Sequence, residues 1–235
     1  MPKRENIEYL IRGMDLPKFL KFVYEDLLSY TFGRDERTIE TCADIAHRGT
    51  HCLLKMYFKM SRQERPKFKE DIVKLIARCI EKLFSQQIST REEFDVWHKK
   101  TCEEIREVAN TYNIPNWSEW AENGYTHGLA QLWLNSTIEY MLLMEKWDDH
   151  LEPIKKYLHV PAKHNTLNAA SKEFGIKIIN NQGQFDLYNG NTSKFFKLWD
   201  YNEYIKFQEE LRTFVDCPID WVFSLRSNNK DESKQ

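Results

Sequence analysis

One run of polar residues has the types and the spacing of a chemical site. His127, Gln131, Asn135 and Glu139 recur every four residues within an otherwise apolar stretch. A helix would place them on one slowly winding stripe. An exposed helix face more often carries Lys, Arg and Glu. The His, Gln and Asn side chains therefore indicate either a buried or partly wet hydrogen-bonded network, or a pocket for a ligand or substrate.

If the stripe lines a pocket, His127 and Glu139 are the candidate catalytic residues, and Gln131 and Asn135 are the candidate binding residues. Histidine has a reference pKa of about 6.5, which suits acid–base chemistry near neutral pH. No P-loop, dinucleotide fingerprint, nucleophile elbow or acidic metal cluster accompanies the stripe in the sequence. The sequence therefore predicts no cofactor.

Two further pairs have the spacing of metal ligands on one face of a helix. His47 lies four residues before His51, and His98 lies four residues before Cys102. Four such ligands from two helices would suit tetrahedral zinc, which predicts a zinc-stabilised bundle as one alternative. The glutamate that acts as the base in helical zinc proteases is missing between His47 and His51. Cys102 also lies near an apolar stripe, where cysteine commonly serves as a small hydrophobic residue.

Basic residues gather in two places. The group at 55–69 is interleaved with acidic residues, as on a solvated helix face. The second group follows the polar stripe in the sequence and comprises Lys155, Lys156, His159, Lys163 and His164. In this second group, Lys163 and His164 are the candidates for binding a nucleic-acid phosphate.

The charge balance and the cysteines limit the classes of partner. The 235 residues carry 34 Lys and Arg against 36 Asp and Glu, a formal net charge of −2, so attraction to a phosphate backbone does not dominate the chain. No apolar run approaches the roughly 20 residues of a membrane span, and the N-terminus shows no apolar signal core. The five cysteines form no C-x-x-C pair, as is typical of reduced thiols. We expect a cytoplasmic protein with no membrane partner.

The scarcity of turn residues predicts an all-α fold. Only 8 Gly and 7 Pro interrupt the chain, and apolar positions recur at helical intervals along most of it. From 129 to 144 apolar residues occupy most of the circumference, which predicts a central helix buried within a multi-helix bundle. Residues 176–190 are the one strand candidate, as a small hairpin or a long loop. Further helices are predicted at 16–33, 35–57, 66–84, 90–112, 153–161, 162–174 and 200–211.

Capping residues mark where two of these helices begin. Ser89 or Thr90, each with a glutamate three residues later, provides a capping box for the helix near 90. Asp200 caps the last predicted helix, which Cys217 and Pro218 close.

The sequence divides into three stretches. Residues 1–113 are expected to form an N-terminal amphipathic helical bundle, and residues 114–226 a C-terminal helical region with the central helix. Six of the seven tryptophans lie between Trp117 and Trp221, so the second region supplies the larger aromatic side chains of a shared core. The two regions are expected to pack as one unit. Residues 227–235 are polar and are predicted to be a disordered tail.

Three stretches resemble a family of bacterial and phage helical proteins that has no assigned activity. They are residues 93–98 (EFDVWH) with Cys102, residues 124–135 (GYTHGLAQLWLN), and residues 201–208 (YNEYIKFQ) with 218–221 (PIDW). The resemblance extends over about half of the chain. It implies an all-helical fold and a bacterial or phage context, and it implies no mechanism.

A second resemblance, to helix–hairpin–helix DNA glycosylases, rests on residues 160–164 (VPAKH), which follow the predicted central helix. In that family a Val-Asp-Thr-His-like stretch carries the catalytic Asp. No Asp stands in this stretch here, and the Gly-rich hairpin that binds DNA phosphate in that family is also missing. The resemblance therefore implies a related helical scaffold without base-excision activity.

These features predict a non-enzymatic helical binding or accessory protein of a bacterial or phage system. Its partner would be a protein or a nucleic acid, and self-association into a homo-oligomer is a further expectation. The many aromatic residues, the balanced charge and the lack of a catalytic motif support this interpretation. Two alternatives remain. One is an enzyme acting on nucleic acid or a nucleotide at the polar stripe, and the other is the zinc-stabilised bundle.

Overall fold

The computed structural model describes residues 38–112, 114, 124–177 and 196–228. All regular structure in these residues is helical, which confirms the predicted all-α class. The helix predicted at 16–33 and most of the hairpin candidate at 176–190 lie outside the described residues, as does the end of the tail from 229. Residues 176 and 177, which begin the hairpin candidate, belong to neither a helix nor a strand.

The first two described helices replace one predicted helix. The prediction of a single helix over 35–57 was wrong, because α3 (Ile39–Gly49) ends and α4 (His51–Lys59) begins on either side of Thr50. Thr50 has an extended backbone, with φ −106° and ψ 100°. Gly49 and Thr50 are both weak helix formers, so interrupting the helix at this point costs little free energy. The change of direction lets both α3 and α4 contact α7.

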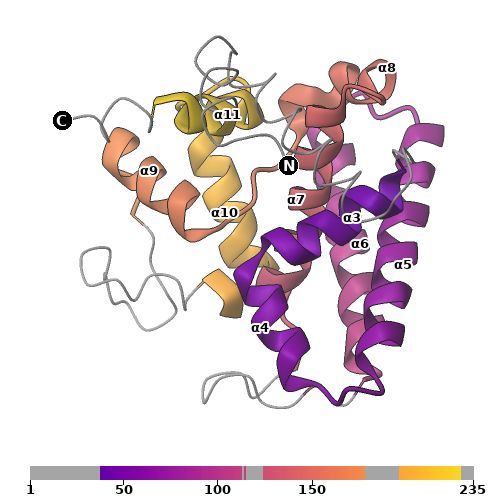
Figure 1. Ribbon diagram of the computed structural model, residues 1–235. Coiled ribbons are helices and arrows are strands. Elements are labelled where there is room, and N and C mark those ends of the chain that lie inside the picture. Colours follow the sequence, from indigo (N-terminus) through magenta and orange to yellow (C-terminus); the bar gives the residue numbers. More distant parts are fainter. Residues whose placement is uncertain (1–37, 113, 115–123, 178–195, 229–235) are drawn as a thin grey trace, which may run out of the picture.

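A capping box sets the start of the helix that carries His98. The Thr90 hydroxyl accepts a hydrogen bond from the Glu93 amide at 3.2 Å, and the Glu93 carboxylate accepts one from the Thr90 amide at 3.1 Å. This arrangement confirms the predicted capping box with Thr90 as its first residue. Helix α6 (Arg91–Asn110) then runs beside α5 (Arg65–Ser85), as Figure 1 shows. Its register turns His98 and Cys102 inward.

Helix α7 (His127–Met144) is buried at every residue except Tyr140. Thr126 caps its start, and Glu145 ends it in the left-handed conformation with φ 56°. It contacts α3, α4, α6, α10 and the short helix η3 (Phe196–Leu198), and α3 crosses in front of it in Figure 1. The Trp133 indole N–H donates to the Ala43 carbonyl at 2.8 Å, which joins α7 to α3 inside the core.

The rest of the described chain consists of short helices around α7. Asp200 caps α10 through a capping box with Glu203, as predicted. The prediction that Pro218 closes the last helix was wrong, because proline suits the first position of a helix and here begins one more. The elements are α8 (Asp148–Leu151), η1 (Glu152–Tyr157), α9 (His164–Phe174), α10 (Tyr201–Arg212) and α11 (Pro218–Asn228).

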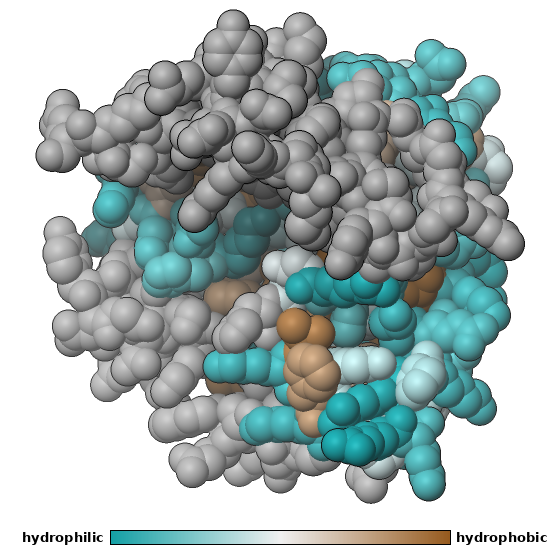
Figure 2. Space-filling model, in the orientation of Figure 1, coloured by the Kyte–Doolittle hydropathy of each residue, from teal (hydrophilic) through white to brown (hydrophobic). Residues whose placement is uncertain are grey.

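The surface of the described residues is largely polar. On the face drawn in Figure 2 these residues are mostly hydrophilic, with a small apolar area over α4. None of the helices described here is both long enough and apolar enough to cross a membrane. The apolar side chains gather instead in one core, to which α3, α5, α6, α7 and α10 all contribute.

The close approach of η3 to α7 gives a test of the fold. A Cβ added at Gly128 would lie 1.9 Å from the Phe196 carbonyl oxygen, and the Gly128 amide donates to the Trp199 carbonyl at 3.0 Å. Because the clash is with backbone, we expect Gly128→Ala to lower the free energy of unfolding by about 2–3 kcal/mol. Chemical denaturation measures this change.

Gly49→Ala is the matched control, since Gly49 is also helical. Its added Cβ would lie 2.5 Å from the Tyr140 hydroxyl, at the movable end of a side chain. Alanine also gains about 1 kcal/mol of helix propensity over glycine, so we expect a loss below about 1 kcal/mol. Equal losses for the two variants would contradict the packing of η3 on α7.

Candidate functional site

The polar stripe of α7 is buried along its whole length. Gln131 and Asn135 are 0% exposed, His127 is 1% exposed and Glu139 is 2% exposed. The two amide side chains face α6, α10 and the segment at 160–162, and they hydrogen-bond to all three. The stripe residues therefore belong to the interior, where each polar group needs a partner from the protein.

The orientation of the two amides follows from one backbone group. The Ala162 amide can only donate, and it donates to Gln131 Oε1 at 3.2 Å. Gln131 Oε1 also accepts from Asn135 Nδ2 at 3.1 Å, so the Asn135 nitrogen is identified as well. Asn135 Oδ1 must then be an acceptor, and its partner is His98 Nε2 at 2.9 Å. His98 Nε2 therefore carries the proton.

The other end of the network begins at a carboxylate. Asp95 Oδ1 can only accept in its ionised form, and it accepts from His159 Nε2 at 2.7 Å. A neutral His159 then has its lone pair on Nδ1, which accepts from the Tyr204 hydroxyl at 2.8 Å. The Tyr204 oxygen in turn accepts from Asn135 Nδ2 at 2.8 Å. The two ends meet at Asn135 without conflict, and every group between them has one defined role.

Arg212 binds the Asp95 carboxylate, which forms one end of the network. Its guanidinium donates to both Asp95 oxygens, at 3.2 and 3.3 Å, and to the Tyr157 carbonyl at 2.7 Å. Burial alone would raise the pKa of Asp95, but the hydrogen bonds from His159 and Arg212 and the positive charge of Arg212 outweigh it and lower that pKa. Asp95 therefore stays ionised and remains a pure acceptor.

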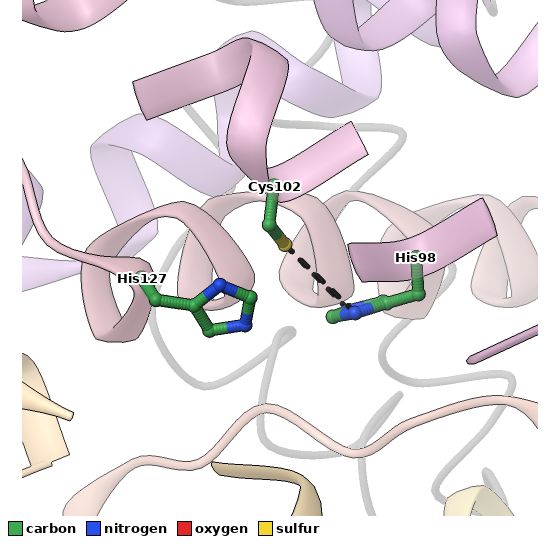
Figure 3. Close-up of side chains that lie close together, drawn as sticks. All are labelled: His98, Cys102 and His127. Atoms are coloured by element: carbon green, nitrogen blue, oxygen red, sulfur yellow. Dashed lines mark hydrogen bonds between the residues drawn. The ribbon is translucent and has the colours of Figure 1, made fainter. Parts of the chain in front are cut away.

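Three potential metal ligands lie beside this network (Figure 3). His98 and Cys102 come from α6, and His127 comes from the first turn of α7. One ligand atom from each residue lies within 4.8 Å of the other two. The Cys102 sulfur is 3.8 Å from His98 Nδ1, the nitrogen that the network leaves without a proton. All three side chains are buried.

Burial keeps these groups neutral. It lowers the pKa of His127 to about 3 and that of His98 well below the usual value for histidine. It lowers the pKa of His159 to about 4, although the hydrogen bond to Asp95 acts in the opposite direction. It raises the pKa of the Cys102 thiol well above its usual value. The cluster therefore consists of neutral imidazoles and a thiol when no cation is bound.

The structure separates the two residues predicted to be catalytic. Glu139 Oε2 accepts from the Lys163 ammonium at 3.1 Å. His127 lies twelve residues earlier on the same helix, which corresponds to about 18 Å along the axis. A single substrate group could not contact both. The predicted binding residue His164 is placed elsewhere again, with its Nε2 hydrogen-bonded to Asn168 at 3.0 Å.

Of the four predicted metal ligands, two lie in one cluster and a third lies elsewhere. His98 and Cys102 come together as their spacing implied, but the third member of the cluster is His127. His47 lies on α3, with its ring 4.8 Å from the Trp133 ring and 5.0 Å from the Tyr57 ring. Nothing is described for the His51 side chain. Among the described residues, His47 does not join His98 and Cys102 in one cluster, and a site that also includes His51 stays a prediction.

Most residues of the hydrogen-bonded network were not predicted from sequence patterns. Asp95, Tyr204 and Arg212 come from α6 and α10, and His159 comes from the segment after η1. Tyr204 was predicted only as part of the helix at 200–211, and His159 only as one of a basic group. Their joint role depends on tertiary contacts over as many as 117 residues of sequence, as between Arg212 and Asp95, and spacing along one helix carries no such signal.

Comparisons of the chain with models of protein families, with curated proteins and with solved structures gave no match.

The direction of the hydrogen bonds in the network predicts that the Tyr204 hydroxyl stabilises the fold and that the Tyr201 hydroxyl does not. Tyr204→Phe leaves His159 Nδ1 without its donor and Asn135 without one acceptor, so we expect a loss of about 2 kcal/mol in the free energy of unfolding. Tyr201→Phe is the control, because the Tyr201 ring contacts His127 at 5.3 Å while its hydroxyl takes no part in the network. We expect a change below about 0.5 kcal/mol for the control. Similar losses in both variants would rule out the hydrogen-bond assignment.

The buried histidines predict a loss of stability in mild acid. Their folded pKa values lie below the unfolded value of about 6.5, so the unfolded chain binds more protons and stability falls as pH drops below about 6.5. For His127, with its pKa lowered to about 3, the contribution continues down to that pH. Between about pH 7 and pH 5, His127→Leu should remove about 2 kcal/mol of the loss.

Denaturation at the two pH values, in the presence of a chelator, measures this difference. The control is His150→Leu, because His150 is exposed and stacks on Phe84. It should leave the acid-induced loss unchanged. An unaltered loss in His127→Leu would show that His127 is not held neutral by the fold.

Proposed function

We propose that the chain is a non-enzymatic helical binding protein that docks an acidic protein partner on the surface of α4. The observation that carries this proposal is Phe58, which is 58% exposed on a helix whose other large apolar side chains are wholly or partly buried. A location in the cytoplasm of a bacterial or phage system is part of the same proposal.

The interior supports a role without catalysis. Gln131 and Asn135 use their donors and acceptors on one another and on neighbouring elements. His127 and Glu139 are too far apart to act on one group, given the length of twelve helical residues. The alternative of an enzyme with a pocket along α7 therefore lacks a substrate position among the described residues.

The second basic group offers little to a nucleic acid. Lys155 pairs with Glu152 at 3.0 Å and with Asp220 at 3.1 Å. Lys163 pairs with Glu139, and His159 is buried against Asp95. Phosphate binding needs cations whose charge is available to the ligand. His164 is hydrogen-bonded to Asn168 at 3.0 Å, so four of the five residues in this group are engaged within the protein.

The α4 surface (Leu54, Tyr57 and Phe58, with Arg65 from the start of α5) combines apolar area with positive charge. The Arg65 guanidinium lies 5.4 Å from the centre of the Phe58 ring and 5.8 Å from that of Tyr57. Exposed basic residues surround it, and an apolar area over α4 is visible in Figure 2. Aromatic residues and arginine are enriched in protein interfaces, and complementary charge steers association. The exposed basic residues are Lys55, Lys59, Arg62 and Lys67.

Phe58→Ser tests the proposal. The variant should lower the affinity for the partner at least about tenfold, because an aromatic side chain at the centre of an interface carries much of the binding energy. Immobilised wild-type and variant chains are compared for proteins retained from a cell extract, and the affinity of a retained acidic protein is then measured directly. Phe214→Ser is the matched control, since Phe214 is 51% exposed on another surface.

Two outcomes would contradict the proposal. One is a partner whose affinity falls equally in Phe58→Ser and Phe214→Ser, which would indicate a general loss of folding. The other is salt-sensitive binding of DNA or RNA that Phe58→Ser leaves unchanged, which would favour a nucleic-acid partner. Sedimentation of the purified chain over a range of concentrations shows whether a second copy occupies the same surface.

A further inference from the structure

We propose that His98, Cys102 and His127 bind one divalent cation of the zinc class and so join the middle of α6 to the first turn of α7. This inference is independent of the α4 surface and of any partner bound there. It rests on the geometry of the cluster, on the lack of a hydrogen-bond partner for His127 in the described part of the chain, and on the tautomer that the network imposes on His98.

The cluster is close to the size of a tetrahedral site. Its three ligand atoms lie within 4.8 Å of one another. Zinc–nitrogen and zinc–sulfur bond lengths place tetrahedral ligand atoms about 3.3–3.6 Å apart, so binding requires a contraction of about 1–1.5 Å. The His127 and His98 side chains extend toward each other from either side of Cys102 in Figure 3, so rotations of these side chains would supply this contraction.

His127 is the strongest indication of a missing ligand. It is 1% exposed, and neither ring nitrogen has a hydrogen-bond partner among the described residues. A buried polar group without a partner costs about 1–3 kcal/mol and calls for an explanation. His47 shares this lack, but it joins no group of three potential metal ligands among the described residues. His127 faces a thiol and a second imidazole, and a cation would give it a partner.

The network prepares His98 as a ligand. Because His98 Nε2–H donates to Asn135 Oδ1 at 2.9 Å, the lone pair is on Nδ1. The Cys102 sulfur lies 3.8 Å from this nitrogen and 3.9 Å from Nε2, so the tautomer and not the distance identifies Nδ1 as the ligand atom. Histidine ligands of metals characteristically donate their other N–H to a carbonyl or carboxylate, which fixes the ring and the tautomer. Asn135 is thus a positioning residue, and the chain from Asp95 through Tyr204 holds it in place.

The chemical types of the three ligand atoms determine which cations the cluster would bind. Two imidazoles and a thiolate favour zinc and similar borderline cations over magnesium or calcium, which prefer oxygen. On binding, the Cys102 thiol loses its proton to solvent and the sulfur forms a bond to the metal, so the site gains one net positive charge. No fourth His, Cys, Asp or Glu joins the cluster in the described part of the chain, and a water molecule would complete the tetrahedron.

Cobalt(II) titration of the full-length, chelator-treated and reduced chain tests the proposal. We expect one Co²⁺ per chain, with the thiolate-to-metal charge-transfer band and the visible spectrum of a tetrahedral site, and displacement by Zn²⁺. Cys102→Ser should abolish the charge-transfer band, and His127→Leu should weaken binding at least about 100-fold. Cys79→Ser is the matched control, because Cys79 is another buried thiol, on α5, and should leave the band intact.

The metal-free stability of His127→Leu separates a ligand from a structural residue. Since His127 makes no hydrogen bond to any residue that the structure describes, the metal-free variant should melt at or above the wild-type temperature. Zn²⁺ should then raise the melting temperature of the wild type and not that of the variant. The proposal is overturned if the wild type shows no charge-transfer band, if Cys102→Ser retains it, or if Zn²⁺ stabilises both chains equally.

Discussion

Burial of α7 on all sides is the constraint on which the rest of the structure depends. A polar side chain on such a helix cannot turn to water, so Gln131 and Asn135 must find donors and acceptors on other elements. They find them on the backbone at 160–162, on Tyr204 of α10 and on His98 of α6. Because the Ala162 amide only donates and the Asp95 carboxylate only accepts, the intervening groups each take one orientation. The network therefore specifies how three helices and one loop meet.

The same constraint decides the chemistry of the interior. Burial favours neutral imidazoles and a protonated thiol, so the cluster of His98, Cys102 and His127 holds no charge of its own. Such a cluster accepts a cation only by releasing the thiol proton, which explains why one divalent ion and not a substrate is the ligand that we infer. Interior and surface then have separate roles. The interior positions α6 against α7, while Phe58 and the basic residues around it are exposed and form the surface on which we propose that a partner docks.

Much of the local structure could be predicted from the sequence, because helix periodicity and capping are local properties. The all-α class and the helix starts at Thr90 and Asp200 were predicted correctly. The break at Thr50 was not, because the apolar stripe continues across it and only contact with α7 requires the turn. The prediction that Pro218 ends a helix was wrong, because proline is equally suited to the first position of a helix.

For the site, the sequence by itself determined which side chains share a helix face. His98 with Cys102, and Gln131 with Asn135, are set by the period of the α-helix alone. Only the tertiary structure decided that His127 joins the first pair and that Asp95, His159 and Tyr204 extend the second into a network. Such contacts form between elements distant in sequence. They follow from how whole helices cross and bury their surfaces, which no local spacing encodes.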